Sequence, residues 1–192
     1  FERIEREFND SKERAEEIKN RDSNEFENLE VPEFKEGSCL LKHQIKPVVH
    51  GLALKNSANF SVPGAGKTWM AFATYFLAKH QQELPTIDRL LVICPIPAMQ
   101  VWEEEYEIIT GKSSEDKCIR ITKDNLDDGI IPRLAENKEI ILINYDKLAG
   151  VNAERFLAAL QLLVENFNFY IILDESHKIK NYEYPAKTGP NV

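Results

Sequence analysis

The segment Ser61–Thr68, SVPGAGKT, limits what this chain can fold into more than any other stretch. Gly64 and Gly66 permit backbone conformations in which successive N–H groups point inward around an anion. Lys67 offers a positive charge for the outer phosphates of a nucleotide, and the Thr68 hydroxyl suits magnesium. A helix is predicted to follow, and its N-terminus also favours a bound anion. The segment therefore predicts a phosphate-binding loop, with a glycine-rich turn that binds nothing as the alternative.

A second informative segment is an acidic pair at the end of an apolar run. Residues Phe169–Leu173 are strand formers, and such a run predicts a strand buried on both faces of a parallel sheet. Asp174 and Glu175 follow at its carboxyl end, where ligands bind in open α/β sheets. Asp174 is predicted to hold Mg²⁺, directly or through water, and Glu175 to polarise an attacking water. An acidic pair that only caps a turn is the alternative, and the phosphate loop upstream favours ATP hydrolysis.

Predicted strands and helices alternate along the chain from residue 40 onward. Strands are predicted at residues 58–62, 89–94, 117–121, 139–144 and 169–173, and helices at residues 44–54, 69–80, 97–110, 124–136 and 152–166. The first of these strands is unusually polar. Alternation of this kind predicts an α/β fold with a mostly parallel sheet and helices on both faces.

The N-terminal part of the chain differs in character from the rest. Residues 1–21 are rich in charge, with apolar residues on a heptad-like spacing, and predict an amphipathic helix. This helix either leads into the domain as a solvated element or packs on a partner or an autoinhibited surface. Residues 22–38 are polar and predict a linker. The predicted division is therefore an acidic helical and linker segment at 1–38 and a nucleotide-binding domain at 39–192.

Several segments resemble the superfamily 2 helicases and, within them, the Swi/Snf-like DNA translocases. Residues Asp174–Asn181, DESHKIKN, resemble motif II, which usually reads Asp-Glu-Ala-His followed by a variable residue and Ile-Lys-Asn. Ser176 stands where alanine is usual. In the phosphate loop, Ser61 stands where the widest form of the motif has glycine, and members of this superfamily commonly have alanine or serine there.

Three further segments carry the same resemblance, in the order expected of the family. Leu41–Gln44, LKHQ, resembles the upstream segment whose glutamine recognises adenine. Leu91–Pro95, followed by the WEEE of Trp102–Glu105, resembles motif Ia and its Trp-x-x-Glu extension. Ile141–Tyr145, ILINY, resembles motif Ib. The resemblance covers roughly residues 40–182, and motif II and the Trp-x-x-Glu extension are its most specific parts.

The resemblance implies roles for individual residues. The residues expected to bind ATP are Gln44, Ser61, Gly64, Ala65, Gly66, Lys67 and Thr68, with Thr68 and Asp174 as ligands of Mg²⁺. The residues expected in catalysis are Lys67, Asp174 and Glu175, and those expected to contact nucleic acid are Pro95, Tyr145 and Lys178. His177 is expected to couple the ATP site to DNA or to a second lobe. Packing explains Tyr145 equally well and is the favoured role of Trp102, while Glu103–Glu105 is most simply a solvated helix face.

Composition limits the cellular setting and the partners. The 43% hydrophobic content suffices for one core, and neither a membrane-spanning run nor a secretory signal is visible. Cys39, Cys94 and Cys118 form no CxxC pair and predict free thiols in an intracellular compartment, the cytoplasm with its nucleoid or the nucleus. The net charge is −8, of which residues 1–38 carry −6 (7 Lys or Arg against 13 Asp or Glu). The near-neutral remainder leaves room for weak DNA binding.

The sequence as a whole predicts a three-layer RecA-like P-loop fold preceded by an N-terminal helical segment. Its expected function is that of the ATP-binding lobe of a Swi/Snf-like ATPase, which uses ATP and Mg²⁺ to translocate along double-stranded DNA. Motif III and the second lobe with its arginine fingers are not found before Val192, so the lobe is expected to be incomplete and nearly inactive alone. The alternatives are another superfamily 2 motor, namely a restriction or phage-defence translocase or an unwinding helicase, or a non-catalytic nucleotide-binding scaffold.

Overall fold

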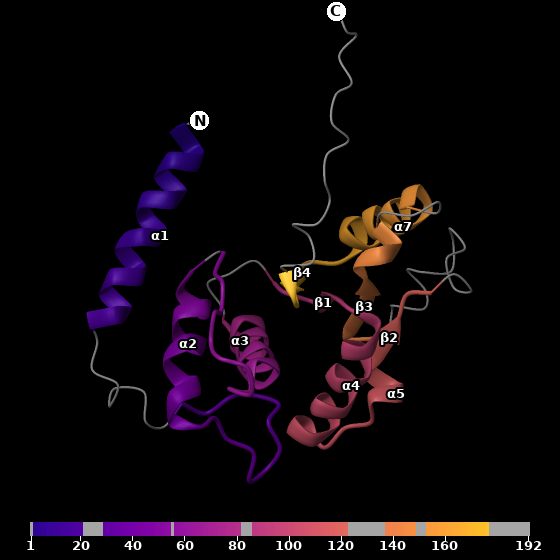
Figure 1. The fold of residues 1–192 in the computed structure, drawn as a ribbon, viewed down its shortest axis with the longest axis horizontal. Helices are drawn as coiled ribbons and strands as arrows, with labels where there is room; N and C mark the ends of the chain where they lie inside the picture. The colour runs from indigo at the N-terminus through magenta and orange to yellow at the C-terminus, as the bar shows by residue number, and fades with distance from the viewer. Residues whose placement is uncertain are drawn as a thin grey trace, which may run out of the picture. The chain divides into compact units, whose positions relative to one another are not determined.

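The chain divides into two compact units. The structure is a computed structural model that describes residues 2–20, 29–54, 56–81, 86–122, 137–148 and 153–176 (Figure 1). Unit 1 comprises Phe1–Asp88 and Val101–Lys117, and unit 2 comprises Arg89–Gln100 and Cys118–Val192. The phosphate loop belongs to unit 1 and the acidic pair to unit 2.

The described part of unit 2 is built on a four-stranded parallel sheet. Its strands are β1 (Arg89–Cys94), β2 (Cys118–Arg120), β3 (Ile140–Asn144) and β4 (Phe169–Leu173). Their order across the sheet is β2-β3-β1-β4, and every pairing is parallel. Because all strands point the same way, their carboxyl ends meet at one edge, where Cys94 pairs with Asn144 and Ile93 with Leu173. The predicted α/β class and four of the predicted strands are confirmed.

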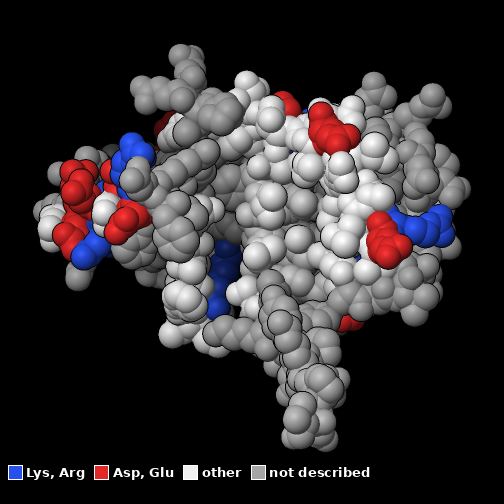
Figure 2. Space-filling view, turned by 90° about the horizontal axis from the view of Figure 1, so that it is seen from above, with Lys and Arg blue, Asp and Glu red and all other residues white. Residues whose placement is uncertain are grey.

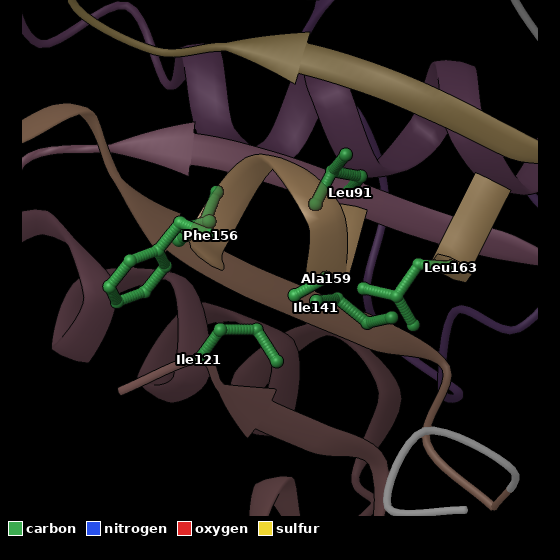
Figure 3. Close-up of a cluster of buried hydrophobic side chains, with 7 residues drawn as sticks. Leu91, Ile121, Ile141, Phe156, Ala159 and Leu163 are labelled. Atoms are coloured by element: carbon green, nitrogen blue, oxygen red, sulfur yellow. The ribbon is translucent and has the colours of Figure 1, made fainter. Parts of the chain in front are cut away.

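One face of the sheet is covered by α7 (Ala153–Asn166). The helix places Phe156, Ala159 and Leu163 on one side, at a spacing of three and four residues that suits an apolar stripe. Figure 3 shows these side chains turned toward the sheet, where they pack against alternate strand residues. The strand residues of this cluster are Leu91, Ile141 and Ile143, and Ile121 directly after β2 joins them. The predicted helix at 152–166 is confirmed.

The central strands β1 and β3 are buried on both faces, but β4 is not. Leu90 and Leu142 face away from Leu91 and Ile141, and both are fully buried. In β4, by contrast, Ile171 and Leu173 are 53% and 48% exposed. The prediction that residues 169–173 form a strand buried on both faces is therefore wrong. The physical reason is position: among the described residues β4 pairs only with β1, and the α7 cluster packs against Phe169 at the start of β4 but includes neither Ile171 nor Leu173.

Unit 1 is helical. Its elements are α1 (Glu2–Asn20), α2 (Lys42–Ala53), α3 (Lys67–His80), α5 (Ser114–Lys117) and the larger part of α4 (Ile96–Thr110). Leu40, Val48, Met70 and Ala73 form one buried cluster between α2 and α3. On α3, Phe72 also packs against the rings of Trp102 and Tyr106 of α4, with centroids 5.1 and 6.0 Å away. The helices predicted at 1–21, 44–54, 69–80 and 97–110 are confirmed.

Residues 29–38 pack against α3 and the end of α4. The Phe34 ring meets the rings of Trp69 and Phe76 edge-on, with centroids 5.8 and 6.3 Å away. The Lys35 N–H donates to the Ile109 carbonyl at 2.9 Å. Near this point the Glu33 carboxylate pairs with the Lys112 ammonium. The sequence predicts a polar linker at residues 22–38. It gives no sign of these contacts, because each of them joins residues far apart in the chain.

The strand predicted at residues 58–62 is wrong, because this stretch has no regular structure. The Asn59 carboxamide oxygen accepts hydrogen bonds from the backbone N–H and the hydroxyl of Ser61, at 3.0 and 2.6 Å. Such local side-chain bonds compete with strand ladders. Phe60 and Val62 are 93% and 71% exposed. The helix predicted at 124–136 lies outside the described residues.

Helix α1 carries acidic and basic side chains that intermingle along its surface, visible at the left of Figure 2. This mixture agrees with the charge-rich amphipathic helix predicted for residues 1–21. No helix within the described ranges combines the length and the apolar character needed to cross a membrane.

Candidate nucleotide site and the carboxyl edge of the sheet

The phosphate loop contains two glycines with left-handed backbone. Gly64 has φ of 80° and Gly66 has φ of 76°, a region that other residues rarely adopt. Between them, the Ala65 N–H donates to the Val62 carbonyl at 3.2 Å and closes a turn. Gly66 is the N-cap of α3, which begins at Lys67. The loop therefore leads directly into a helix N-terminus whose first N–H groups lack partners within the helix.

The last two side chains of the loop suit a triphosphate with magnesium. The Lys67 side chain is exposed and the Thr68 residue is half-buried. Backbone N–H groups of a turn and a helix N-terminus attract anions together. The predicted loop and its helix are confirmed as structure, and the donors present there fit a nucleotide phosphate chain. The binding roles of Ser61 and Ala65 stay predictions, as do those of the two glycines.

Gln44 is joined to the phosphate loop. Its side chain is buried at 4% exposure, and its Nε2 donates to the Ala65 carbonyl oxygen at 3.0 Å. Its Oε1 accepts from the Leu41 N–H at 2.8 Å, just ahead of α2. The His43 Nε2 lies 3.2 Å from the same Ala65 oxygen. Both amide atoms of Gln44 thus have partners inside the chain, and the predicted reading of adenine requires the amide to exchange at least one of them.

Gly66 lies beside the Gln44 amide. A Cβ built on Gly66 would overlap Nε2 of Gln44, whereas nothing lies within 4 Å of a Cβ built on Gly64. A side chain at position 66 would therefore meet two obstacles, the left-handed backbone conformation and the Gln44 amide, which would have to shift. The sequence signalled the first requirement but contained no sign of the second.

Trp69, the residue after Thr68, is hydrogen-bonded to helix α4. The Trp69 indole Nε1–H donates to the Glu105 carboxylate, and both residues are half-buried. The prediction that Glu103–Glu105 is a solvated helix face is therefore wrong for Glu105, whose carboxylate is engaged. Trp102 is 3% exposed and packs on Phe72, so its predicted packing role is confirmed.

In unit 2 the acidic pair lies at the carboxyl end of β4, as predicted. The Asp174 N–H donates to the Ile93 carbonyl at 2.9 Å, which holds Asp174 beside the end of β1. Asp174 is half-buried and Glu175 is exposed. Glu175 has φ of 54°, in the left-handed region where residues with side chains are uncommon. The strand end therefore turns sharply at these carboxylates.

Tyr145 lies at the same edge, just after β3. It opens a short 3-10 helix, Tyr145–Leu148, and is only 8% exposed. Burial raises the pKa of its phenol to about 12, and Asp174, Cys94 and Glu175 add to this effect. Its hydroxyl has no hydrogen-bond partner among the described residues. This burial favours the packing interpretation of Tyr145, and contact with nucleic acid stays a prediction.

The other predicted residues of unit 2 divide into two groups. Pro95 directly follows β1, where its carbonyl accepts from the Ala98 N–H at 3.0 Å in the first turn of α4. His177 and Lys178 lie outside the described residues. Within the described ranges, no group of three or more His, Cys, Asp or Glu side chains is arranged to hold a metal.

A known family matches the chain. The model of the family described as "Type III restriction enzyme, res subunit" matches residues 55–187, more than half of the chain and a stretch that includes both the phosphate loop and the acidic pair. This family is a superfamily 2 helicase-like ATPase domain with a RecA-like fold, in agreement with the parallel sheet and its helices. Such domains generally use ATP with Mg²⁺ and act on DNA together with other domains. Among curated proteins nothing matches the chain.

Proposed function

We propose that this chain, which belongs to the type III restriction enzyme res subunit family, is the ATP-binding lobe of a DNA-dependent motor. The observation that carries the proposal is the loop at Ser61–Thr68. It combines two left-handed glycines with a lysine and a threonine at a helix N-terminus, inside the segment matched by the family. We assign residues 39–192 to the first RecA-like lobe and residues 1–38 to an acidic segment that precedes it.

The proposed roles follow from the chemistry of each side chain. Lys67 and the N–H groups of the loop bind the β- and γ-phosphates, and the Thr68 hydroxyl and Asp174 hold the magnesium. Glu175 orients the attacking water and takes up its proton as that water attacks the γ-phosphorus in line and ADP leaves. The side-chain amide of Gln44 recognises the adenine. Bound magnesium would neutralise charge on the transferred phosphoryl group. These roles require the loop and the acidic pair to serve one nucleotide.

Two further parts complete the proposal. Arginine side chains from a second RecA-like lobe stabilise the charge that develops in the transition state, so we expect slow hydrolysis by residues 1–192 alone. Double-stranded DNA is the proposed track. Pro95, Tyr145 and Lys178 are the proposed contacts to it, with His177 coupling DNA to the ATP site.

The type of motor is a choice between two translocases and a helicase. The block Asp174–Asn181 and the Trp-x-x-Glu segment support a Swi/Snf-like translocase, while the family match favours a restriction-type translocase as strongly. Both would move along a duplex without separating it. Displacement of a third strand from a triplex, without unwinding of the duplex, is the expected result. Separation of duplex strands would instead assign the chain to an unwinding helicase.

ATP turnover separates the motor from a nucleotide-binding scaffold. In a form of the protein that carries both lobes, Glu175→Gln should retain Mg·ATP binding and lose turnover by about 100-fold or more, since a positioned general base contributes about that much. Glu165→Gln, an exposed carboxylate on α7, is the matched control and should turn over ATP normally. If the unchanged protein and Glu175→Gln hydrolyse ATP equally slowly in the presence of DNA, the protein is a scaffold.

A further inference from the structure

The bond between Trp69 and Glu105 joins the start of α3 to the middle of α4. Trp69 follows Thr68 directly and lies in the first turn of α3. The indole has one hydrogen-bond donor, Nε1–H, and that donor is used on the Glu105 carboxylate. A bond to an ionised acceptor is about twice as strong as one between neutral groups. The first turn of α3 is therefore anchored through a side chain next to the proposed nucleotide ligands.

A second contact fixes the geometry of the first. Phe72 lies one turn after Trp69 on α3, and Trp102 lies one turn before Glu105 on α4. Their rings pack with centroids 5.1 Å apart, and Phe72 is fully buried. Two residues spaced by three on each helix therefore make paired contacts, with Trp69 on Glu105 and Phe72 on Trp102. Two such contacts restrict both sliding and rotation of α3 against this part of α4.

The indole is also held from its other side. The Phe34 ring lies edge-on to the Trp69 ring at an interplanar angle of 87°. Trp69 is thus in contact with segment 29–38 and with α4 at once. A ring held by packing and by a charged hydrogen bond keeps one rotamer, and ligands supported in this way are positioned more accurately.

We propose that Glu105 is a positioning residue of the nucleotide site, which holds Trp69 and thereby fixes the orientation of Lys67 and Thr68 toward the phosphates. The inference rests on the proposed function, because it concerns the same phosphate loop. Glu105 itself touches no nucleotide. Its role is to reduce the freedom that the first turn of α3 loses when a triphosphate binds.

The charge of Glu105 allows this role to be distinguished from a purely electrostatic one. A carboxylate in the same unit as an anion site disfavours a bound triphosphate by like-charge repulsion. Removing the charge alone should therefore leave ATP affinity unchanged or slightly higher. Removing the acceptor should lower it. Glu105→Gln keeps an oxygen acceptor for the indole without the charge, and Glu105→Ala removes both.

The experiment measures Mg·ATP and magnesium tripolyphosphate affinity by calorimetry on residues 1–192. We expect Glu105→Ala to weaken both ligands about tenfold, as loss of one charged hydrogen bond implies, while Glu105→Gln stays within about twofold. Trp69→Phe keeps an aromatic ring but removes the N–H donor, and it should weaken both ligands like Glu105→Ala. Combining Glu105→Ala with Trp69→Phe should cause no further loss of affinity beyond that of either single variant. Glu104→Ala is the matched control and should bind normally, because Glu104 is an exposed acid on the same helix.

A merely structural bond would give a different pattern. Indole N–H resonances report the contact without any nucleotide, and the Trp69 signal should move in Glu105→Ala. If that signal moves while the affinity of the folded variant equals that of the unchanged protein, the positioning role is wrong. If the unchanged protein itself fails to bind Mg·ATP, the proposed function fails and the bond only stabilises the fold. Unfolding midpoints measured alongside ensure that every variant is compared in its folded state.

Discussion

Replacing Gly66 by alanine should destabilise unit 1 far more than the same replacement at Gly64. Both glycines have left-handed backbone, with φ of 76° and 80°, so an alanine at either position costs about 1–2 kcal/mol of strain. At Gly64 nothing lies within 4 Å of the added Cβ, and strain is the whole effect. At Gly66 the added Cβ would overlap the Gln44 amide nitrogen.

The extra cost at Gly66 follows from what Gln44 must give up. When its amide moves aside, it loses the bond to the Ala65 carbonyl and the bond from the Leu41 N–H. Each is worth about 1 kcal/mol in a buried setting. The sum with the strain is about 3–4 kcal/mol for Gly66→Ala, against about 1–2 kcal/mol for Gly64→Ala.

Urea unfolding followed by tryptophan fluorescence measures the difference. Both tryptophans of the chain, Trp69 and Trp102, belong to unit 1, so the signal reports on that unit. In a Gln44→Ala background the cost of Gly66→Ala should fall to that of Gly64→Ala, because the overlap has been removed. Equal costs for the two glycines, or an unchanged cost in the Gln44→Ala background, would refute the reasoning.

Two further predictions concern unit 2. Leu163→Ala should lower the free energy of unfolding by about 3–5 kcal/mol, because Leu163 is fully buried in the α7 cluster. Leu173 is 48% exposed, so Leu173→Ala should lower the free energy of unfolding by only about 1 kcal/mol or less. Similar losses for the two variants in urea unfolding would contradict the account. Tyr145→Phe should be neutral or slightly stabilising at pH 7, since the buried hydroxyl it removes has no partner among the described residues. Because the folded pKa of Tyr145 is raised to about 12, the unfolded state loses its proton first, and this group should reduce stability as the pH rises from about 10 to 12. That decline should be smaller in Tyr145→Phe, and an identical slope in both proteins would show that the phenol is not perturbed.

The parts of the fold that the sequence predicted well are those set by local chemistry. Residues 89–94 and 169–173 are short apolar runs rich in β-branched or large side chains, and both are strands with the predicted bounds. The Ser61–Thr68 loop was predicted because only glycine takes its backbone angles without strain. In each case neighbours in sequence hold the deciding information.

The parts that the sequence could not predict depend on contacts between distant residues. Gln44 bonds to Ala65, Trp69 to Glu105, and Phe34 packs on Trp69. The polar members of these pairs belong to residue types that often lie in solvent, and the aromatic members to types that often lie in a core. No local sequence pattern therefore indicates which residue contacts which. The strand predicted at 58–62 fails for a local reason: the segment is unusually polar, and bonds from Ser61 to the Asn59 side chain replace strand pairing. The exposed side of β4 likewise reflects its place in the sheet order, which a single strand sequence does not contain.

Mg·ATP binding to residues 1–192 tests the central claim most directly. Calorimetry should show one bound nucleotide, and Lys67→Ala should weaken its binding at least tenfold, because a charge-assisted contact to phosphate is lost. Lys12→Ala, an exposed lysine on α1, should bind like the unchanged protein. Equal affinity in Lys67→Ala and Lys12→Ala, or no binding by the unchanged protein, would contradict the assignment of Ser61–Thr68 as the ATP site.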